Sequence, residues 1–273
     1  METPLDCFAA DLALIDSHLA RALASQRSST GPSVFACMQY ATDGGKRVRP
    51  LLGLSVARMF SANPAHNLNR ICAVELVHCA SLVIDDLPCM DNHATRREKR
   101  AAHREFGEAV SVLTAFALLT LAVRLSQPNA NDRSETSSVS FQQALLDAIA
   151  TDGLIAGQEL DLVSRKMVGS DRPKKTCGEL KTAPLFELAC RAGLPSGPLK
   201  EFCYLRLLDF GRVLGKLYQS VDDMIDGEAG AANIAEPLTA CRANLGELQS
   251  LGLDTSSLFT FVDWIATKVP ALV

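Results

Sequence analysis

Two acidic clusters, each placed directly after an apolar run, constrain this chain more than any other feature of its sequence. The first cluster spans residues 85–91 (DDLPCMD) and the second spans residues 222–226 (DDMID). Charging the end of a buried helix is unfavourable unless another group pairs with the charge. Two such clusters facing one cavity would form an oxygen-rich site of the kind that Mg²⁺ shares with substrate phosphates. The pattern therefore indicates diphosphate chemistry rather than two solvated helix faces.

The composition favours an all-α fold. A chain of 273 residues with 48% apolar and 21% charged residues has ample material for a core. Alanine and leucine are plentiful, aromatic residues are few, and apolar residues rarely alternate with period two. No linker or repeat divides the chain. We therefore expect one domain over residues 1–273, built as a bundle of about ten or more helices around a central active-site cavity.

Other classes of protein are disfavoured by charge, cysteine usage and hydropathy. The longest apolar stretches, residues 109–123 and 71–84, are shorter than the ~18–20 residues that span a bilayer. The N-terminus lacks the basic and apolar segments of a signal peptide. Nine cysteines without a CxxC pair fit a reducing compartment, and a net charge of −4 argues against binding nucleic acid. We expect a cytoplasmic protein with no membrane span and no nucleic-acid partner.

Hydrophobic periodicity and turn residues predict the helices. They are expected over residues 5–24, 34–40, 50–60, 67–87, 106–125, 141–163, 178–192, 199–226, 235–251 and 255–268, with loops over 127–138 and 165–175. Residues 106–125 are apolar on nearly every side, which predicts a central helix. Asp85 and Asp91 would lie on opposite faces of a continuous helix, so the chain around Pro88 has to loop out for Asp91 to rejoin the metal side. Asp222 and Asp226 share one helix face.

Basic residues supply the opposite charge. Residues 44–50 (GGKRVRP) form a glycine turn before a helix start, where backbone N–H groups and the side chains of Lys46 and Arg49 can converge on an anion. Arg96 and Arg97 follow the first acidic cluster, and Lys181 lies in a third helical region. Together these groups predict two anionic pockets, one phosphate group being held through Mg²⁺ and the other directly by arginine and lysine.

An ordered set of short motifs gives the chain a family resemblance. It resembles the trans (head-to-tail) isoprenyl diphosphate synthases over about residues 43–226, with weaker similarity outside that region. The matching segments are residues 44–50 (GGKRVRP), 75–78 (ELVH), 81–91 (SLVIDDLPCMD), 96–97 (RR), 106–109 (FGEA), 157–162 (GQELDL), 181–182 (KT) and 218–223 (YQSVDD).

The resemblance implies a role for each matching residue. It implies an Mg²⁺ cluster, which also binds the allylic diphosphate, made of Asp85, Asp86, Asp91, Asp222, Asp223 and Asp226. It implies allylic-substrate contacts from Arg96, Lys181 and Gln219, with Thr182 as a further substrate-binding residue. It implies isopentenyl diphosphate contacts from Lys46, Arg49, His78 and Arg97. Within these sets, the residues expected to carry catalysis are Asp85, Asp86, Asp91, Arg96, Lys181, Gln219 and Asp222.

The reaction implied by the resemblance is the condensation of isopentenyl diphosphate with an allylic diphosphate (dimethylallyl, geranyl or farnesyl) in a homodimer. Mg²⁺ and the cationic side chains would stabilise the leaving diphosphate, the allylic C–O bond would ionise, and the isopentenyl double bond would attack the cation. Ala80 and Ser81 lie one turn before Asp85, at the depth of about one added isoprene unit. An aromatic residue at the position of Ala80 is typical of C15 enzymes, so these small residues imply a C20 product, geranylgeranyl diphosphate.

Some features depart from the family pattern and leave alternatives open. The loop after the second acidic cluster is shortened, so a lysine that helps to close the allylic pocket has no counterpart. Phe116 stands where the family has an aspartate, and its ring would shorten the cavity if it pointed inward. The alternatives are a farnesyl diphosphate (C15) synthase, a class I terpene cyclase, and a low-activity partner subunit of a heteromeric synthase. A cyclase would not need the Lys46 and Arg49 pocket, and silent subunits often lose an acidic cluster.

Overall fold

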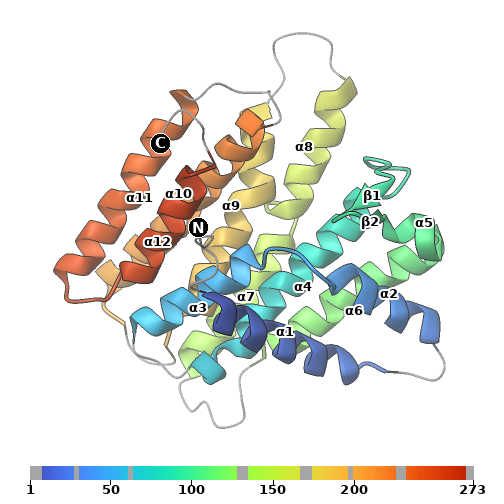
Figure 1. Ribbon diagram of the computed structural model, residues 1–273, viewed down its shortest axis with the longest axis horizontal. Helices are drawn as coiled ribbons and strands as arrows, with labels where there is room; N and C mark the ends of the chain where they lie inside the picture. The colour runs from blue at the N-terminus through green and yellow to red at the C-terminus, as the bar shows by residue number, and fades with distance from the viewer. Residues whose placement is uncertain are drawn as a thin grey trace.

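The computed structural model describes residues 8–27, 31–60, 64–127, 135–166, 174–195, 199–225 and 232–268. In chain order its elements are α1 (Ala9–Ala24), α2 (Pro32–Thr42), α3 (Val48–Met59), the 3₁₀ helix η2 (Pro64–His66), α4 (Leu68–Asp85), β1 (Thr95–Arg96), β2 (Lys99–Arg100), α5 (Ala102–Phe106), α6 (Glu108–Leu125), α7 (Glu135–Ile149), α8 (Leu154–Lys166), α9 (Lys174–Ala192), α10 (Glu201–Ile225), α11 (Ala232–Ser250) and α12 (Ser256–Ala266). In Figure 1, α4 runs through the middle of the bundle, with α9 to α12 on one side and α2, α5 and α6 on the other. The predicted all-α fold is confirmed, and the short β1–β2 hairpin is an addition that periodicity did not predict.

The helix predicted over residues 141–163 is in fact two helices, α7 and α8. The break lies at residues 150–153, where the amide of Gly153 donates to the carbonyl of Ala150 at 2.8 Å. A Cβ atom on Gly153 would lie 2.3 Å from the carbonyl oxygen of Ala148, so no larger residue fits this turn. Thr-Asp-Gly at residues 151–153 is a turn signal, but apolar residues continue on both sides of it, so periodicity alone predicts one helix.

Both predicted loops are shorter than expected. The prediction over residues 127–138 overlaps the start of α7, and the prediction over 165–175 overlaps the end of α8 and the start of α9. The remaining parts, residues 128–134 and 167–173, lie outside the described residues. Polar side chains suggested loops at these positions, but polar residues are also compatible with the solvent face of a helix terminus.

Helix α6 is not the central helix that its composition predicted. One side packs against α4 and α2, but Leu113 is 56% exposed and Phe116 is 64% exposed. Phe116 therefore points away from the interior, and the concern that its ring shortens the cavity does not apply. By length and composition alone, the 18 residues of α6 would suffice to cross a membrane, which corrects the expectation that no apolar stretch is long enough. In the structure, the apolar residues of α6 form a face that is half exposed.

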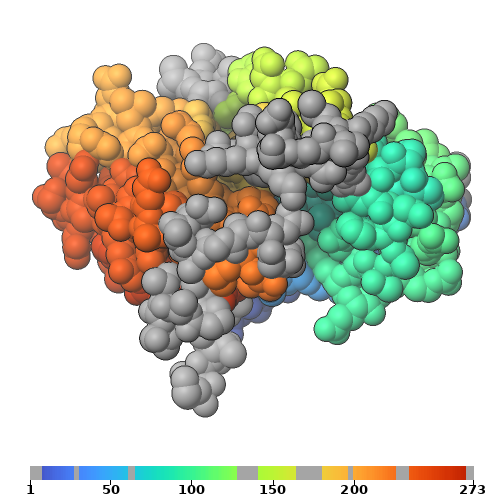
Figure 2. All heavy atoms as spheres, turned by 90° about the horizontal axis from the view of Figure 1, so that it is seen from above, coloured from blue at the N-terminus to red at the C-terminus, as the bar shows by residue number. Residues whose placement is uncertain are grey.

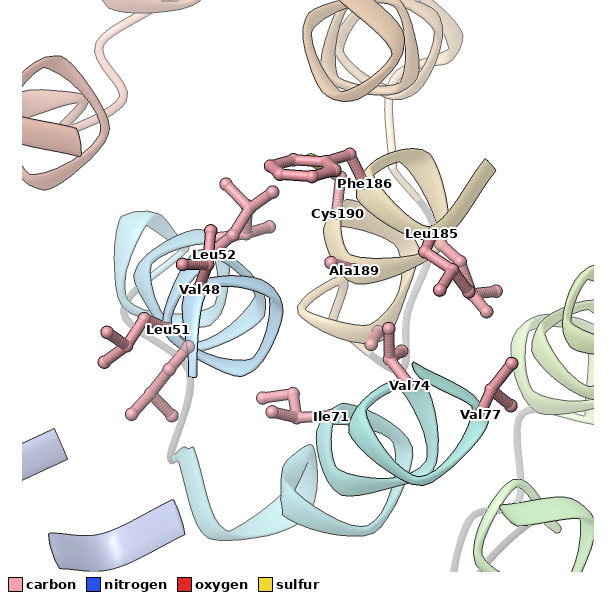
Figure 3. Packing of buried hydrophobic residues seen from close by; sticks show 14 of the residues in the cluster. Val48, Leu51, Leu52, Ile71, Val74, Val77, Leu185, Phe186, Ala189 and Cys190 are labelled. Atoms are coloured by element: carbon pink, nitrogen blue, oxygen red, sulfur yellow. The ribbon is translucent and has the colours of Figure 1, made fainter. Parts of the chain in front are cut away.

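A tightly packed junction of α3, α4 and α9 lies beneath the candidate site. Figure 3 shows the labelled side chains of α3, α4 and α9 where the three helices meet, with Leu51 on the side of α3 that faces away from α9. They include Ile71, Val74 and Val77 from α4 and Leu185, Phe186, Ala189 and Cys190 from α9, all of which are buried. Because packed interiors transmit displacement, this junction fixes the polar residues that the same helices carry at its edge.

Glycines allow α10 to lie unusually close to α9. A Cβ atom on Gly215 would be 2.7 Å from the Cα atom of Ala183, and one on Gly211 would be 2.9 Å from the Sγ atom of Cys190. One turn beyond Gly215, the side chain of Gln219 meets that of Thr182 in a hydrogen bond of 2.6 Å. The close backbone approach therefore sets the distance between two predicted site residues.

We expect Gly215→Ala to lower the free energy of unfolding, although alanine favours a helix by about 1 kcal/mol over glycine. The new methyl group meets backbone rather than a movable side chain, and such overpacking costs about 1–3 kcal/mol. Urea denaturation measures the change. The matched control is Gly246→Ala in α11, where a Cβ atom meets nothing within 4 Å and the substitution should stabilise the protein. Equal stabilisation by both substitutions would contradict the close approach of α9 and α10.

Candidate active site

The first acidic cluster begins at the C-terminal end of α4 and folds back on itself. Helix α4 ends at Asp85, two residues earlier than predicted. Leu87 precedes Pro88, and a residue directly before proline disfavours helical backbone, so the helix does not continue through it. The amide of Asp91 then donates to the carbonyl of Asp85 at 2.9 Å, and the amide of Asn92 donates to that of Leu87 at 3.0 Å. The predicted loop around Pro88 is therefore confirmed, and it returns Asp91 to the end of α4.

Asp85 lies at the electrostatic centre of this cluster. Burial raises its pKa to about 6, and the neighbouring carboxylates of Asp91 and Asp86 add to that rise. Lys181 of α9 opposes the rise, and its ammonium group donates to the carboxylate of Asp161 in α8 at 2.7 Å. Asp85 is therefore a buried carboxylate with two acidic neighbours, opposed by two cations, Lys181 and Arg96.

Asp86 has a different environment from its neighbour. Its side chain is only 2% exposed, and Arg96 of β1 donates to both of its carboxylate oxygens, at 2.5 to 3.2 Å. The hydrogen bond with Asp86 in turn raises the pKa of Arg96. His93 completes the group, with Nδ1 at 3.3 Å from the same carboxylate. A metal ion at Asp86 would have to share its oxygens with Arg96, so the metal role of Asp86 stays a prediction.

Arg97 holds the glycine turn through hydrogen bonds to backbone carbonyls. Its guanidinium donates to the carbonyl of Gly44 at 3.1 Å and to those of Ala41 and Asp43 at 3.4 Å. Gly45 has a φ of 93°, and a Cβ atom there would lie 2.7 Å from Cζ of Arg97. Glycine is therefore required both for the backbone conformation and for the approach of Arg97. The predicted contact of Arg97 with isopentenyl diphosphate stays a prediction, since its donors already hold the turn.

Arg49 and His78 form the inner wall next to this turn. The guanidinium of Arg49 lies over the ring of Phe186 at 5.1 Å, and its buried Nε has no hydrogen-bond partner among the described residues. Burial lowers the pKa of Arg49, against Glu75, Tyr218 and Asp222, which raise it. Burial and the charge of Arg49 hold the pKa of His78 well below its usual range, so its imidazole is neutral at pH 7. A buried, under-satisfied guanidinium suits an anion.

The second acidic cluster is tied to α9 by a chain of hydrogen bonds. The hydroxyl of Thr182 donates to the side-chain oxygen of Gln219 at 2.6 Å, and the amide group of Gln219 donates to the carboxylate of Asp223 at 2.7 Å. Asp222 lies close enough to affect Arg49 and Tyr218 electrostatically. The predicted ligand Asp226 lies outside the described residues.

Both acidic clusters reach α9. Lys181 acts on Asp85, and the next residue, Thr182, is joined through Gln219 to Asp223. Seen from above in Figure 2, the teal segment that follows α4 lies on one side of the molecule and the orange helices lie on the other. Among the described residues, which leave out Asp226, no three histidine, cysteine or acidic side chains are close enough together to be a ready metal site. The donors on offer are nevertheless carboxylate oxygens, which Mg²⁺ prefers, and it usually completes its shell with water and substrate phosphate. The donor set therefore fits Mg²⁺.

Three residues of this region were not assigned a role from the sequence. Asp161 pairs with Lys181 and belongs to the matching segment GQELDL, which by itself indicates no role for it. Tyr218 likewise belongs to a matching segment (YQSVDD), before the second acidic cluster, and its ring packs against that of Phe186. Lys268, after α12, lies over the rings of Tyr218 and Trp264, and no sequence motif marked it.

Known proteins are similar to this chain in sequence and in fold. A family model described as polyprenyl synthetase matches residues 32–240. A curated relative from Arabidopsis thaliana, "Putative geranylgeranyl pyrophosphate synthase 8, chloroplastic", is 41% identical over 188 residues, which cover 67% of this chain and 52% of the relative. The chain thus spans about half the length of the curated relatives it matches.

Solved structures share the fold over nearly the whole chain. A geranyltransferase from Legionella pneumophila superposes with a TM-score of 0.84 at 23% identity, covering 97% of each chain. An FPP/GFPP synthase from Zymomonas mobilis superposes with a TM-score of 0.80 at 26% identity, covering 95% of this chain and 98% of the other. The helix arrangement described above is therefore one that such proteins have in common.

Proposed function

The chain belongs to the polyprenyl synthetase family, and on that premise we propose that it is an Mg²⁺-dependent head-to-tail prenyltransferase. The substrates would be isopentenyl diphosphate and an allylic diphosphate, the main product geranylgeranyl diphosphate, and residues 1–273 would act as one domain. The observation that carries the proposal is that cations accompany both carboxylate clusters, with Arg96 bonded to Asp86, Lys181 acting on Asp85, and Arg49 near Asp222.

The residues of this chain divide the work between two substrates. Asp85, Asp91 and Asp222 would hold Mg²⁺ with the allylic diphosphate, joined by Asp86, Asp223 and Asp226. Bound there, Mg²⁺ supplies charge stabilisation for the leaving diphosphate. Lys181, Gln219 and Arg96 would orient that group, while Lys46, Arg49 and neutral His78 would hold the second diphosphate. The apolar side chains beneath the site would exclude water from the carbocation.

The half-exposed face of α6 is the surface we propose for a homodimer. Leu113 and Phe116 are among the most exposed large apolar side chains of the described residues. Apolar area of this kind is stabilised when it is buried against a second copy.

The expected cytoplasmic location, in contrast, has no support from the relatives, several of which carry "chloroplastic" or "mitochondrial" in their names.

The direct test is an assay of the purified chain alone. Isopentenyl diphosphate and each of the dimethylallyl, geranyl and farnesyl diphosphates are supplied with Mg²⁺, and the products are separated by chain length. C20 product from the chain alone supports the proposal. A cyclised hydrocarbon would identify a terpene cyclase, and no turnover without a second subunit would identify a silent partner.

Product length provides a separate prediction. Ala80 is 1% exposed in α4, about five residues or ~7.5 Å of helix axis before Asp85. We expect Ala80→Tyr to shift the main product from C20 to C15, because the phenol ring would close the cavity at that depth. Chromatography of dephosphorylated products measures the shift. Ser81→Phe is a second variant at a half-buried position, in case Ala80→Tyr does not fold. A wild-type protein that stops at C15, or a folded Ala80→Tyr that still makes C20, would place the floor elsewhere.

A further inference from the structure

A cavity separate from the candidate active site lies between α7, α9 and α10. Its volume is about 370 Å³, within the ~300–1,000 Å³ that is usual for small-molecule sites. It is lined along α9 from Leu180 to Arg191 and by the facing turns of α7 and α10. In the part of the chain that the structure describes, no residue predicted to bind Mg²⁺ or diphosphate lines it. The ammonium group of Lys181, next to Leu180 in the sequence, instead binds Asp161 of α8.

The cavity is long and narrow. The span from Leu180 to Arg191 is about 16 Å of helix axis. A volume of about 370 Å³ over that length leaves a mean cross-section of roughly 22 Å², about the width of one hydrocarbon chain. At about 30 Å³ for a group the size of a water molecule, the cavity has room for a tail of about twelve carbons.

Apolar side chains form the walls on the sides of α7 and α9. Ala148, Ala183 and Leu188 line the cavity and are at most 9% exposed. Pro184 lies inside α9, where it has no N–H to donate and its ring crowds the carbonyl of Leu180. The small alanines and the proline ring therefore leave a channel in a region that larger side chains would fill at the usual packing density.

Two cations of α10 stand on the remaining side. Arg212 and Lys216 are four residues apart, so they share a helix face, and both line the cavity. Arg212 is 52% exposed, and its ion pairs with Glu187 and Asp209 are long, at 3.5 and 3.6 Å. Arg191 is held more closely, since it donates to Glu187 at 3.0 Å. Among the described residues, Arg212 thus retains guanidinium donors that an anion could use.

The charges of the lining favour an anion over a cation. Three cations face two carboxylates, which leaves a net charge of +1. Glu187 is already shared by Arg191 and Arg212. The other carboxylate, Asp147 of α7, is exposed and accepts a hydrogen bond from Gln143 at 2.8 Å. An apolar channel with cations along one side suits a ligand that has an apolar tail and a negative head.

We propose that this cavity binds a single-chain amphipathic anion. A hydrocarbon tail of about twelve carbons would lie between α7 and α9, and a phosphate or carboxylate head would meet Arg212 and Lys216. The width of the cavity limits the tail to one chain, and its walls remove that chain from water. The inference does not depend on the proposed function, because no residue assigned to prenyl transfer takes part.

Calorimetry of the full chain with dodecyl phosphate, in chelator and below the micelle concentration, tests the binding. We expect one ligand per chain. Ala144→Trp should weaken the Kd about tenfold or more, because the indole would fill the cavity from α7. Arg212→Gln should have a similar effect, because a charge-assisted hydrogen bond is lost. Uncharged dodecanol should bind about tenfold more weakly than dodecyl phosphate for the same reason.

Matched substitutions outside the cavity should leave the Kd unchanged. Ala150→Trp places the same indole at an exposed turn position. Arg242→Gln removes an arginine of almost the same exposure, 53% against 52% for Arg212. Ala144→Leu is a smaller obstruction, in case Ala144→Trp does not fold. Dodecyl phosphate should also raise the Tm of the wild type, and it should not raise that of the obstructed variant.

An unchanged Kd in a folded variant of Ala144, or equal binding of dodecanol, would overturn the inference. Binding that is lost in Arg49→Ala and kept in Arg212→Gln would place the ligand in the candidate active site and overturn it as well. Two more ligands identify the source of the anion: tighter binding of farnesyl monophosphate than of dodecanoate indicates an isoprenoid phosphate, and the reverse order indicates a fatty acid. A chain that binds dodecyl phosphate without turning over prenyl substrates would contradict the proposed function alone.

Discussion

Asp85→Asn is expected to lower kcat/KM by about a thousandfold or more while the protein remains folded, because a charge that stabilises the leaving diphosphate through Mg²⁺ is removed. Asparagine has nearly the same shape as aspartate, so packing around the end of α4 is preserved. Asp222→Asn should have a similar effect from the opposite side of the site. Steady-state assays at saturating Mg²⁺ measure both losses.

The stability of Asp85→Asn should move in the opposite direction from its activity. The pKa of Asp85 is raised to about 6, so the folded protein holds the ionised carboxylate less favourably than the unfolded chain does. For a carboxyl group of this kind, folding stability declines as pH rises from the unfolded pKa toward the folded one, and the penalty is fully present at pH 7. The Tm of Asp85→Asn, measured in chelator at pH 7, should therefore equal or exceed that of the wild type.

A substitution of the same type at an exposed position provides the control. Asp152 lies in the exposed turn between α7 and α8, and Asp152→Asn should change neither rate nor Tm. Near-wild-type activity in Asp85→Asn would rule out the proposed metal role of that carboxylate. A large loss of Tm alongside the loss of rate would mean that Asp85 acts through the fold rather than through the reaction.

The sequence predicted the parts of the site that local chemistry determines. Proline and the spacing of Asp85 and Asp91 required the loop that returns Asp91 to α4, because no other local conformation joins those carboxylates. The glycine turn before Arg49 was likewise readable, since consecutive glycines commonly mark positive φ. The long helices were predictable because apolar periodicity is a property of the residues themselves, whereas the short helix α5 and the 3₁₀ helix η2 were not predicted.

Contacts between distant segments could not be predicted in the same way. Arg97 follows Arg96 in the sequence, yet Arg96 binds Asp86 and Arg97 holds the glycine turn. Which of two adjacent arginines meets which partner depends on the path of the β1–β2 hairpin, which has no periodic signal. Lys268 carries no motif at all, and its relation to the site depends on how α12 packs. The exposure of α6 was missed because a composition that is apolar on every side does not say what covers each side.

The largest expected loss of stability follows from replacing Arg47. This residue is close in sequence to the predicted site residues Lys46 and Arg49, but its own side chain is buried. Its side chain is 6% exposed and donates to Asp16 at 2.8 Å, to Glu75 at 2.9 Å, and to the carbonyl of Thr42 at 2.6 Å. We expect Arg47→Met to lower the free energy of unfolding by about 3–5 kcal/mol, because Glu75, only 2% exposed, would lose its main buried cation. Urea denaturation measures the change.

Two further variants test whether the unpaired charge is the cause. Arg242 pairs with Asp263 at the same distance of 2.9 Å, but both side chains are more than half exposed, so Arg242→Met should cost less than about 1 kcal/mol. Adding Glu75→Gln to Arg47→Met should recover much of the lost stability, because the buried carboxylate is then gone. No recovery in the double variant would show that packing or the left-handed backbone of Arg47, with φ of 49°, carries the effect instead.

This buried pair also explains why the glycine turn can present its other cations to a ligand. Arg47 lies between Lys46 and Arg49, and its contacts with α1, α2 and α4 fix the backbone from which both side chains project. Any Arg47→Met protein that remains folded at low temperature should therefore have a raised KM for isopentenyl diphosphate, although the guanidinium of Arg47 is already engaged by Asp16, Glu75 and Thr42. Because Arg47 positions the turn through α1, α2 and α4, the affinity for diphosphate and the stability of the fold should fall together in this variant.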